Sequence, residues 1–164
     1  LQAVLRGTGF RMQIDQSGAI AVARVAGALF PHKQTLLRRI GRKGPLDVPM
    51  LGAGKRAYAG PLAILVGPRT ASGAEAIAAV VEESGRGFTV GERTAGALTG
   101  AARFTLPDGG ELSVAEFDIR TSGDRRLEGS GFTPAHVVAP GFGDLRAGRD
   151  PVLERAVALL SARR

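Results

Sequence analysis

A serine and a glutamate stand three residues apart at the start of a predicted helix, in the Thr-Ala-Ser-Gly-Ala-Glu segment of residues 70–75. The helix follows residues 61–66, a continuous apolar run that predicts a strand buried on both faces. Free N–H groups and the helix dipole at such a corner favour a developing negative charge, so a hydroxyl on Ser72 is well placed to attack a carbonyl carbon. A capping box has the same spacing, with Ser72 only as the cap and Glu75 as its partner. Spacing alone leaves both interpretations open.

The composition excludes several other kinds of site and partner. The 164 residues contain no cysteine, which excludes disulfides, thiolate metal sites and thiol catalysis. His32 and His136 share no metal-ligand spacing, so we expect no metal and no cofactor. The net charge of +7 comes mostly from scattered arginines and aromatics make up only 5%, so we expect no nucleic-acid partner. No apolar run approaches the roughly 20 residues of a membrane span.

Strands and helices alternate around the serine, a pattern typical of an α/β domain. The expected elements are a strand end at residues 3–5, helices at 18–30 and 72–83, strands at 35–40, 61–66 and 87–90, and a final helix that Asp150 and Pro151 open. The Pro-Asp-Gly-Gly turn of residues 107–110 predicts a β-hairpin between residues 104–106 and 111–114. Residues 41–60 are rich in glycine, proline and charge and predict a mobile loop.

Four blocks of the sequence resemble, in order, those of the carboxy-terminal processing (tail-specific) proteases and their relatives, the tricorn core proteases. The blocks are Leu-Val-Gly-Pro-Arg-Thr-Ala-Ser-Gly-Ala-Glu at 65–75, Gly-Glu-Arg-Thr-Ala-Gly at 91–96, Leu-Pro-Asp-Gly-Gly at 106–110 and Glu-Gly-Ser-Gly-Phe-Thr-Pro at 128–134. Residues 5–9 match an Asp-Leu-Arg-Gly-Asn-x-Gly-Gly turn of the family more weakly. The resemblance implies a Clp-protease/crotonase-like core of stacked β-β-α units, with a mostly parallel sheet and an added β-hairpin. It also implies that residues 1–164 are one catalytic-core domain, the C-terminal part of a larger protein in which a PDZ-type domain comes first.

The same resemblance assigns roles to residues. Ser72 matches the nucleophile, and the N–H of Gly73 matches one half of the oxyanion hole. The other half should come from the turn at Gly9 and Phe10. At this turn the sequence departs from the family: Phe10-Arg11 replaces a glycine pair, and Val4 and Thr8 replace an aspartate and an asparagine.

The general base is the largest departure from the family. Processing proteases place a lysine and a glutamine after the serine, where this chain has Ala97 and Ala101. Lys33, Lys43 and Lys55 all precede the serine in loop-like segments, where an ammonium should stay hydrated and protonated, so we expect no Ser-Lys dyad.

The tricorn-like branch instead uses a histidine from upstream, oriented by a glutamate near the block that contains Glu128. This branch implies that Glu128 is the orienting carboxylate and that the histidine precedes Leu1. Glu128 could equally be a solvated loop residue. For His32 and His136 we expect surface or edge positions.

Two functions remain open from the sequence. The first is a serine peptidase that forms an acyl-enzyme on Ser72 and acts on peptides or proteins, outside the cytoplasm as is usual for the family. The second is a catalytically silent relative that binds peptides or serves as a scaffold, an alternative that Ala97 and Ala101 motivate. Whether the protein forms a homo-oligomer is left open.

Overall fold

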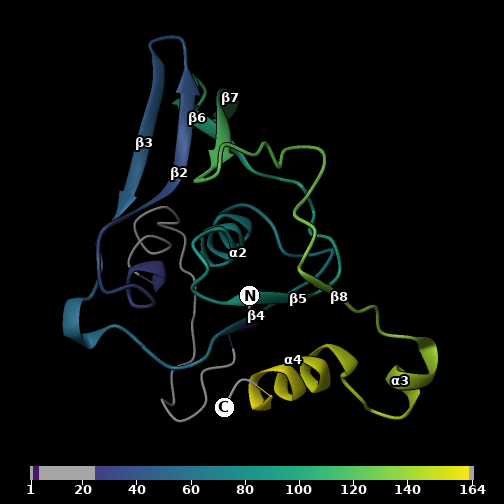
Figure 1. Ribbon diagram of the computed structural model, residues 1–164. Helices are drawn as coiled ribbons and strands as arrows, with labels where there is room; N and C mark the ends of the chain where they lie inside the picture. Colours follow the sequence, from purple (N-terminus) through teal and green to yellow (C-terminus); the bar gives the residue numbers. More distant parts are fainter. Residues whose placement is uncertain (1, 4–24, 163–164) are drawn as a thin grey trace.

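The computed structural model describes residues 2–3 and 25–162 and contains two four-stranded sheets with helices between and beside them (Figure 1). The strands of the first sheet lie in the order β1 (Gln2–Ala3), β4 (Ala63–Val66), β5 (Phe88–Gly91) and β8 (His136–Val137). β5 pairs in parallel with both β4 and β8, whereas β1 is antiparallel to β4. The carboxyl ends of three parallel strands therefore meet at one edge.

Helices cover both faces of this first sheet: α2 (Gly73–Glu83) lies on one side and α4 (Pro151–Ser161) on the other (Figure 1). Alternate residues of β4 explain the arrangement. Ile64 and Val66 pack into the cluster around α2, whereas Ala63 and Leu65 pack with Ala156 of α4. Burial on both faces is the reason that this strand reads as a continuous apolar run.

The second sheet is antiparallel throughout, with the strand order β3 (Gly44–Met50), β2 (Gln34–Gly41), β7 (Glu111–Thr121) and β6 (Thr99–Thr105). Leu36, Met50 and Ile119 of this sheet share one core with α2. α2 thus lies between the two sheets, and eight of its eleven residues are buried. Four of the eight are alanines, whose small side chains let both sheets approach the helix closely.

Two expectations from the sequence need correction here. Residues 41–60 are not one loop, since they contain β3 and a 3₁₀ turn, η1 (Gly54–Arg56). Pro45 and Pro49 are tolerated because β3 is an edge strand, where a missing N–H costs little. The expected mostly parallel sheet corresponds to the first sheet, in which β1 is the antiparallel strand, but the β6–β7 hairpin is not an addition to it and belongs to a separate antiparallel sheet.

The remaining described elements complete the fold. Residues 25–27 are helical and Pro31 follows them, and α3 (Phe142–Arg146) precedes α4. Asp150 caps α4 by accepting a hydrogen bond from the N–H of Leu153 at 2.9 Å, as the Asp-Pro pair predicts. Among residues 2–3 and 25–162, no helix combines the length and apolar character that a membrane crossing requires.

Candidate active site

Ser72 stands exposed at the corner between β4 and α2. The chain leaves β4 at Val66 and turns at Thr70, whose N–H donates to the Gly67 carbonyl at 2.8 Å. The Gly67 N–H in turn donates to the Thr70 hydroxyl at 3.0 Å. After this turn, Ser72 is the residue directly before the helix, and it is exposed to solvent.

The backbone of Ser72 is unlike that of an ordinary helix cap. An N-cap residue has β-region torsions and its hydroxyl accepts a backbone N–H. Ser72 has φ 56° and ψ −126°, and its hydroxyl accepts no hydrogen bond from the N–H groups of the described helix. Such a conformation costs a side-chain-bearing residue about 1–3 kcal/mol. A serine held on a strained strand-to-helix turn has its hydroxyl presented outward, as nucleophiles of α/β hydrolases have.

Glu75 holds this corner from inside the protein. Its side chain is fully buried and accepts four hydrogen bonds. Oε2 accepts from the N–H groups of Ser72 at 2.9 Å and Ala97 at 3.0 Å, and Oε1 accepts from the Gly96 N–H at 2.8 Å and from the Thr94 hydroxyl. The sequence predicted only a helix-start carboxylate; the structure shows that Glu75 fixes Ser72 to the loop after β5.

Glu128 lies in a turn that packs against the same loop. The Gly129 N–H donates to the Gly96 carbonyl at 2.8 Å, and the Thr94 N–H donates to the Phe132 carbonyl at 3.0 Å. Oε2 of Glu128 is buried and has no hydrogen-bond partner within the described part of the chain. The turn therefore holds a carboxylate oxygen away from water, and none of the described residues donates a hydrogen bond to it.

The structure shows where position 97 and the three lysines, the candidates for a lysine base, lie relative to Ser72 and to solvent. Ser72 and Ala97 donate to the same oxygen of Glu75, so position 97 lies beside the serine, as the resemblance implies, but carries only a methyl group. Lys33, Lys43 and Lys55 are all exposed, in agreement with the expectation that no lysine is desolvated.

The two histidines lie where the sequence predicted, at the surface and at a sheet edge. His32 is exposed. His136 lies in the edge strand β8, and its ring packs edge-on against Phe88 at 5.4 Å, with Phe88 in the cluster that contains Ala156 of α4. Its ring is therefore on the face of the sheet opposite α2. Gly9 and Phe10, with Val4 and Thr8, lie outside the described residues, and so does the turn expected to complete the oxyanion hole.

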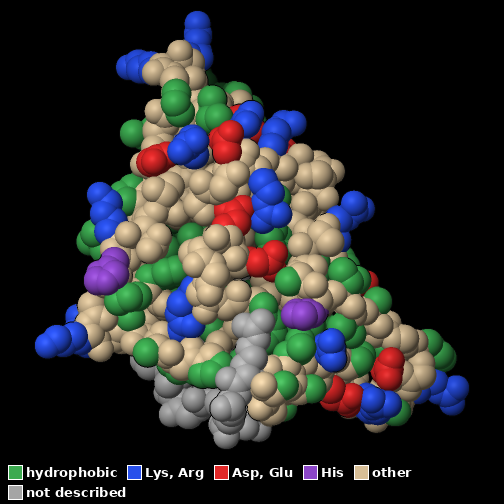
Figure 2. Space-filling view, in the orientation of Figure 1, with side chains coloured by type: hydrophobic (Ala, Val, Ile, Leu, Met, Phe, Trp, Pro, Cys, Tyr) green, Lys and Arg blue, Asp and Glu red, His purple; other side chains and the backbone are tan. Residues whose placement is uncertain are grey.

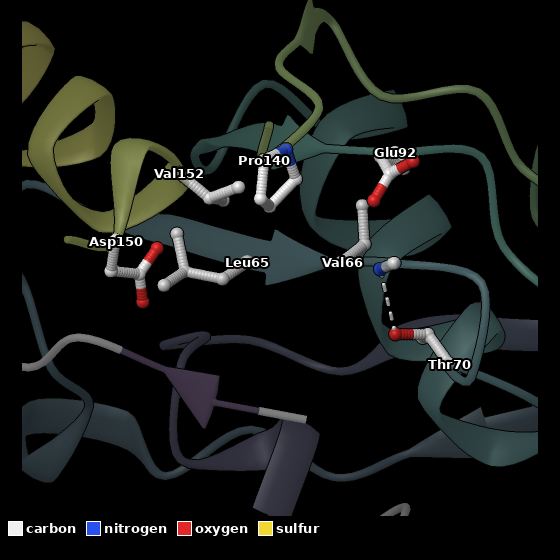
Figure 3. Close-up of a pocket in the computed structure, with 8 residues that line it drawn as sticks. Leu65, Val66, Thr70, Glu92, Pro140, Asp150 and Val152 are labelled. Atoms are coloured by element: carbon white, nitrogen blue, oxygen red, sulfur yellow. Dashed lines mark hydrogen bonds between the residues drawn. The ribbon is translucent and has the colours of Figure 1, made fainter. Parts of the chain in front are cut away.

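A shallow hollow lies at the carboxyl end of β4, just before the serine corner (Figure 3). Its volume is about 280 Å³. Leu65 and Val152 line its apolar part, Glu92 and Asp150 bring carboxylates to it, and Thr70 borders it on the side of Ser72. The hollow is a neighbour of the serine rather than a pocket around it.

Charge is spread over the surface rather than gathered. Figure 2 shows lysine and arginine side chains distributed over the visible face, with acidic side chains between them. Arg126 pairs with Asp118 at 2.9 Å and Arg149 with Glu154 at 2.7 Å. Within residues 2–3 and 25–162, no three His, Cys, Asp or Glu side chains form a group that could hold a metal ion.

Thr94 is the residue that the sequence analysis missed. It is buried, and its hydroxyl donates to Glu75 and accepts a hydrogen bond from the Phe132 N–H at 2.7 Å. The only signal in the sequence is its place in the Gly-Glu-Arg-Thr-Ala-Gly block. Nothing in the spacing reveals which partners the hydroxyl finds 19 and 38 residues away.

An α/β fold with an exposed serine on a strained strand-to-helix corner is typical of serine hydrolases. The family model of peptidase family S41 matches residues 18–138, and the chain belongs to that family. This confirms the kinship with carboxy-terminal processing proteases that the four sequence blocks indicated.

Relatives of known description agree with this membership. The chain is 29% identical over 110 residues to a carboxyl-terminal-processing protease of Picosynechococcus sp., a match that covers 67% of this chain and 26% of that protein. The solved photosystem II D1 C-terminal processing protease is 26% identical, with a TM-score of 0.65 over 74% of this chain and 31% of that one. The tricorn protease, 20% identical, shares the fold with a TM-score of 0.63 over 88% of this chain and 14% of its own. The chain thus spans about a quarter of the length of the curated relative.

Proposed function

We propose that this chain is the catalytic core of a serine peptidase that cleaves peptide bonds through an acyl-enzyme on Ser72. The observation that carries the proposal is the strained, exposed position of Ser72, with φ 56°, at the end of a buried parallel strand. A residue that merely capped the helix would have no need of that backbone strain. Membership of peptidase family S41 supports the peptide bond as the target.

In the proposed reaction Oγ of Ser72 attacks the carbonyl carbon of the substrate while its proton passes to a general base. The C–N bond then breaks and the leaving amine takes the proton, which leaves an ester on Ser72. Water hydrolyses the ester and restores the hydroxyl. The N–H of Gly73 supports the oxyanion from the start of α2, with a second donor proposed at the turn of Gly9 and Phe10; each such donor contributes about 3–4 kcal/mol.

We infer that the base is a histidine upstream of this chain and that Glu128 orients it. His136 packs on the α4 face of the sheet, opposite the helix that follows Ser72, and His32 is an exposed residue before β2. Oε2 of Glu128 is buried and has no partner in the part of the chain that the structure describes. This supports the assignment, because a buried carboxylate oxygen needs a donor and an imidazole N–H supplies one.

The proposal extends to the whole protein. Residues 1–164 would form one catalytic domain with the Clp-protease/crotonase-like stacking of β-β-α units, preceded by a PDZ-type domain that binds the substrate. The match to only 26% of the Picosynechococcus relative supports further domains. The substrate would be a peptide or protein and the site of action periplasmic or otherwise extracytoplasmic, with no nucleic acid involved. A homo-oligomer is compatible with this arrangement.

Labelling of the full-length protein with a fluorophosphonate probe tests the proposal. We expect a covalent adduct on Ser72, located by mass spectrometry of peptides, that Ser72→Ala abolishes. Ser84→Ala is a matched control because Ser84 is an exposed serine at the other end of α2, and its variant should label like the wild type. Labelling that survives Ser72→Ala refutes the nucleophile. An unlabelled wild type instead supports the catalytically silent, peptide-binding alternative.

A further inference from the structure

Thr94 connects the two candidate catalytic segments through one hydroxyl. The side chain is only 6% exposed and lies between α2 and the Glu128 turn. Its Oγ1 donates to Oε1 of Glu75 and at the same time accepts from the N–H of Phe132 at 2.7 Å. A hydroxyl is the smallest side-chain group that can donate and accept at once.

The loop that contains Thr94 and the turn that contains Glu128 are also in close backbone contact. A Cβ on Gly96 would lie 2.6 Å from the Gly131 nitrogen, and a Cβ on Gly131 would lie 2.4 Å from the Thr94 carbonyl oxygen. Both glycines have positive φ, at 72° and 73°. To this backbone contact the Thr94 hydroxyl adds a side-chain hydrogen bond across the junction.

Glu75 connects Thr94 to the candidate nucleophile Ser72. One carboxylate oxygen accepts from Thr94 and Gly96, and the other accepts from Ser72 and Ala97. Because the carboxylate is planar and fully buried, a displacement on the Thr94 side tilts the oxygen that holds the Ser72 N–H.

We propose that Thr94 is a positioning residue whose hydroxyl keeps the Glu128 turn in register with the Ser72 corner. The inference rests on the proposed roles of Ser72 and Glu128 and adds what aligns them. Thr94 itself does not touch the reacting atoms. Misplacement of a catalytic group by about 1 Å can slow a reaction roughly 100-fold, so the loss of this link should slow acylation by about that factor.

The chain supplies a matched control at the other end of α2. Thr121 is also buried, and its hydroxyl donates to Glu83 at 2.7 Å and accepts from the Arg125 N–H at 3.1 Å. Thr94→Val and Thr121→Val therefore remove the same group from the same kind of link. Only the first link leads to Ser72.

The experiment compares the rate of fluorophosphonate labelling of the full-length wild type with those of Thr94→Val, Thr94→Ser and Thr121→Val, across pH. We expect labelling about 100-fold slower in Thr94→Val, a rate within about 3-fold of wild type in Thr94→Ser, and an unchanged rate in Thr121→Val. Equal rates in the two valine variants, or no recovery with serine, overturn the proposal. If Thr94→Val does not fold, Thr94→Ala replaces it, with Thr121→Ala as its control.

Amide hydrogen exchange separates this inference from the proposed function. The Phe132 and Gly129 amides should exchange faster in Thr94→Val and remain protected in Thr121→Val. A wild type that does not label refutes the function of Ser72, whereas the exchange of these two amides still decides whether Thr94 holds the turn. Unchanged protection in Thr94→Val overturns the positioning role.

Discussion

The two ends of α2 are each held by a glutamate, fully buried at one end and partly exposed at the other, and the two carboxylates differ in how their charge is balanced. Glu75, at the N-terminal end, accepts three backbone N–H groups and one hydroxyl, and no cation pairs with it among residues 2–3 and 25–162. Glu83, at the C-terminal end, accepts from the Thr121 and Ser122 hydroxyls, the Gly123 N–H and the Arg125 guanidinium at 2.8 Å.

The helix dipole explains the difference. Its N-terminal end stabilises a negative charge, so amide donors suffice for Glu75, whereas its C-terminal end disfavours one, and Arg125 compensates at Glu83. The comparison teaches that two glutamates with similar sets of hydrogen bonds can have different roles. Glu83 joins α2 to the end of β7, whereas Glu75 fixes the backbone of the candidate nucleophile.

The largest difference in stability between the two ends is expected when each glutamate is replaced by glutamine. Glu75→Gln turns an amide NH₂ toward donors that have no other partner in a fully buried site, so we expect the free energy of unfolding to fall by about 3 kcal/mol. Glu83→Gln should cost about 1–2 kcal/mol, since the Glu83 side chain is 15% exposed and water can reach its donors. Urea unfolding measures both values. Equal losses would contradict the distinction between the two ends.

The pH dependence of stability tests the role of Glu83 at the C-terminal end of α2. Burial raises the pKa of Glu83, but hydrogen bonds from Ser122, Thr121, Gly123 and Arg125 outweigh it, so the pKa lies below its ordinary value. A lowered folded-state pKa contributes stability at pH values above the unfolded pKa, and this contribution is lost as the pH falls through the folded pKa.

The wild type should therefore lose stability more steeply than Glu83→Gln as the pH falls below about 4.3, the ordinary glutamate pKa. Urea unfolding between pH 5 and pH 3 measures the difference between the two proteins. If that difference stays constant over this range, the carboxylate is not held in its charged form by these partners.

The sequence predicted the elements whose signals are local. The apolar run of β4, the start of α2 and the Asp-Pro start of α4 all depend on neighbouring residues, and the structure confirms them. β3 was missed because Pro45 and Pro49 usually interrupt strands, and only its edge position makes them harmless.

In the candidate site, too, local sequence signals were sufficient for some residues and not for others. Ser72 and Glu128 were found from local blocks, although their roles remain proposals. The burial of Glu75 and the link through Thr94 could not be predicted, because their partners lie on loops 19 to 38 residues apart in the chain. Likewise, the positive φ of Ser72 could not be predicted from the residue type, because serine rarely adopts it.

Backbone strain at Ser72 predicts a smaller effect, specific to the N-terminal end. Glycine adopts φ 56° without the penalty that a Cβ imposes, so Ser72→Gly should be about 1 kcal/mol more stable than Ser72→Ala. Ser84, at the C-cap, has φ −82°, so there the glycine variant should be no more stable than the alanine variant. Thermal unfolding of the four variants measures both differences. A Ser72→Gly variant that is less stable than Ser72→Ala would show that the corner is not strained.

Glu128→Gln should have the smallest effect on stability and a large effect on reactivity. Oε2 of Glu128 has no partner within the described residues, so its conversion to an amide breaks no described hydrogen bond and should change the free energy of unfolding by no more than about 0.5 kcal/mol. If Glu128 orients a histidine base, the amide removes the charge that supports the imidazolium, and fluorophosphonate labelling should slow by about 100-fold or more.

Labelling rates and urea unfolding of the full-length protein measure the two quantities on the same sample. Glu116→Gln is the control, since Glu116 is an exposed glutamate on β7 and its variant should change neither. A stability loss of about 1–2 kcal/mol or more in Glu128→Gln with an unchanged labelling rate would make Glu128 a structural anchor like Glu83. A stable but slow variant would instead show that the Glu128 carboxylate acts on the reaction. The segments bound to the N-terminal end of α2 through Thr94 and Glu75 would then differ in function from those bound to Glu83.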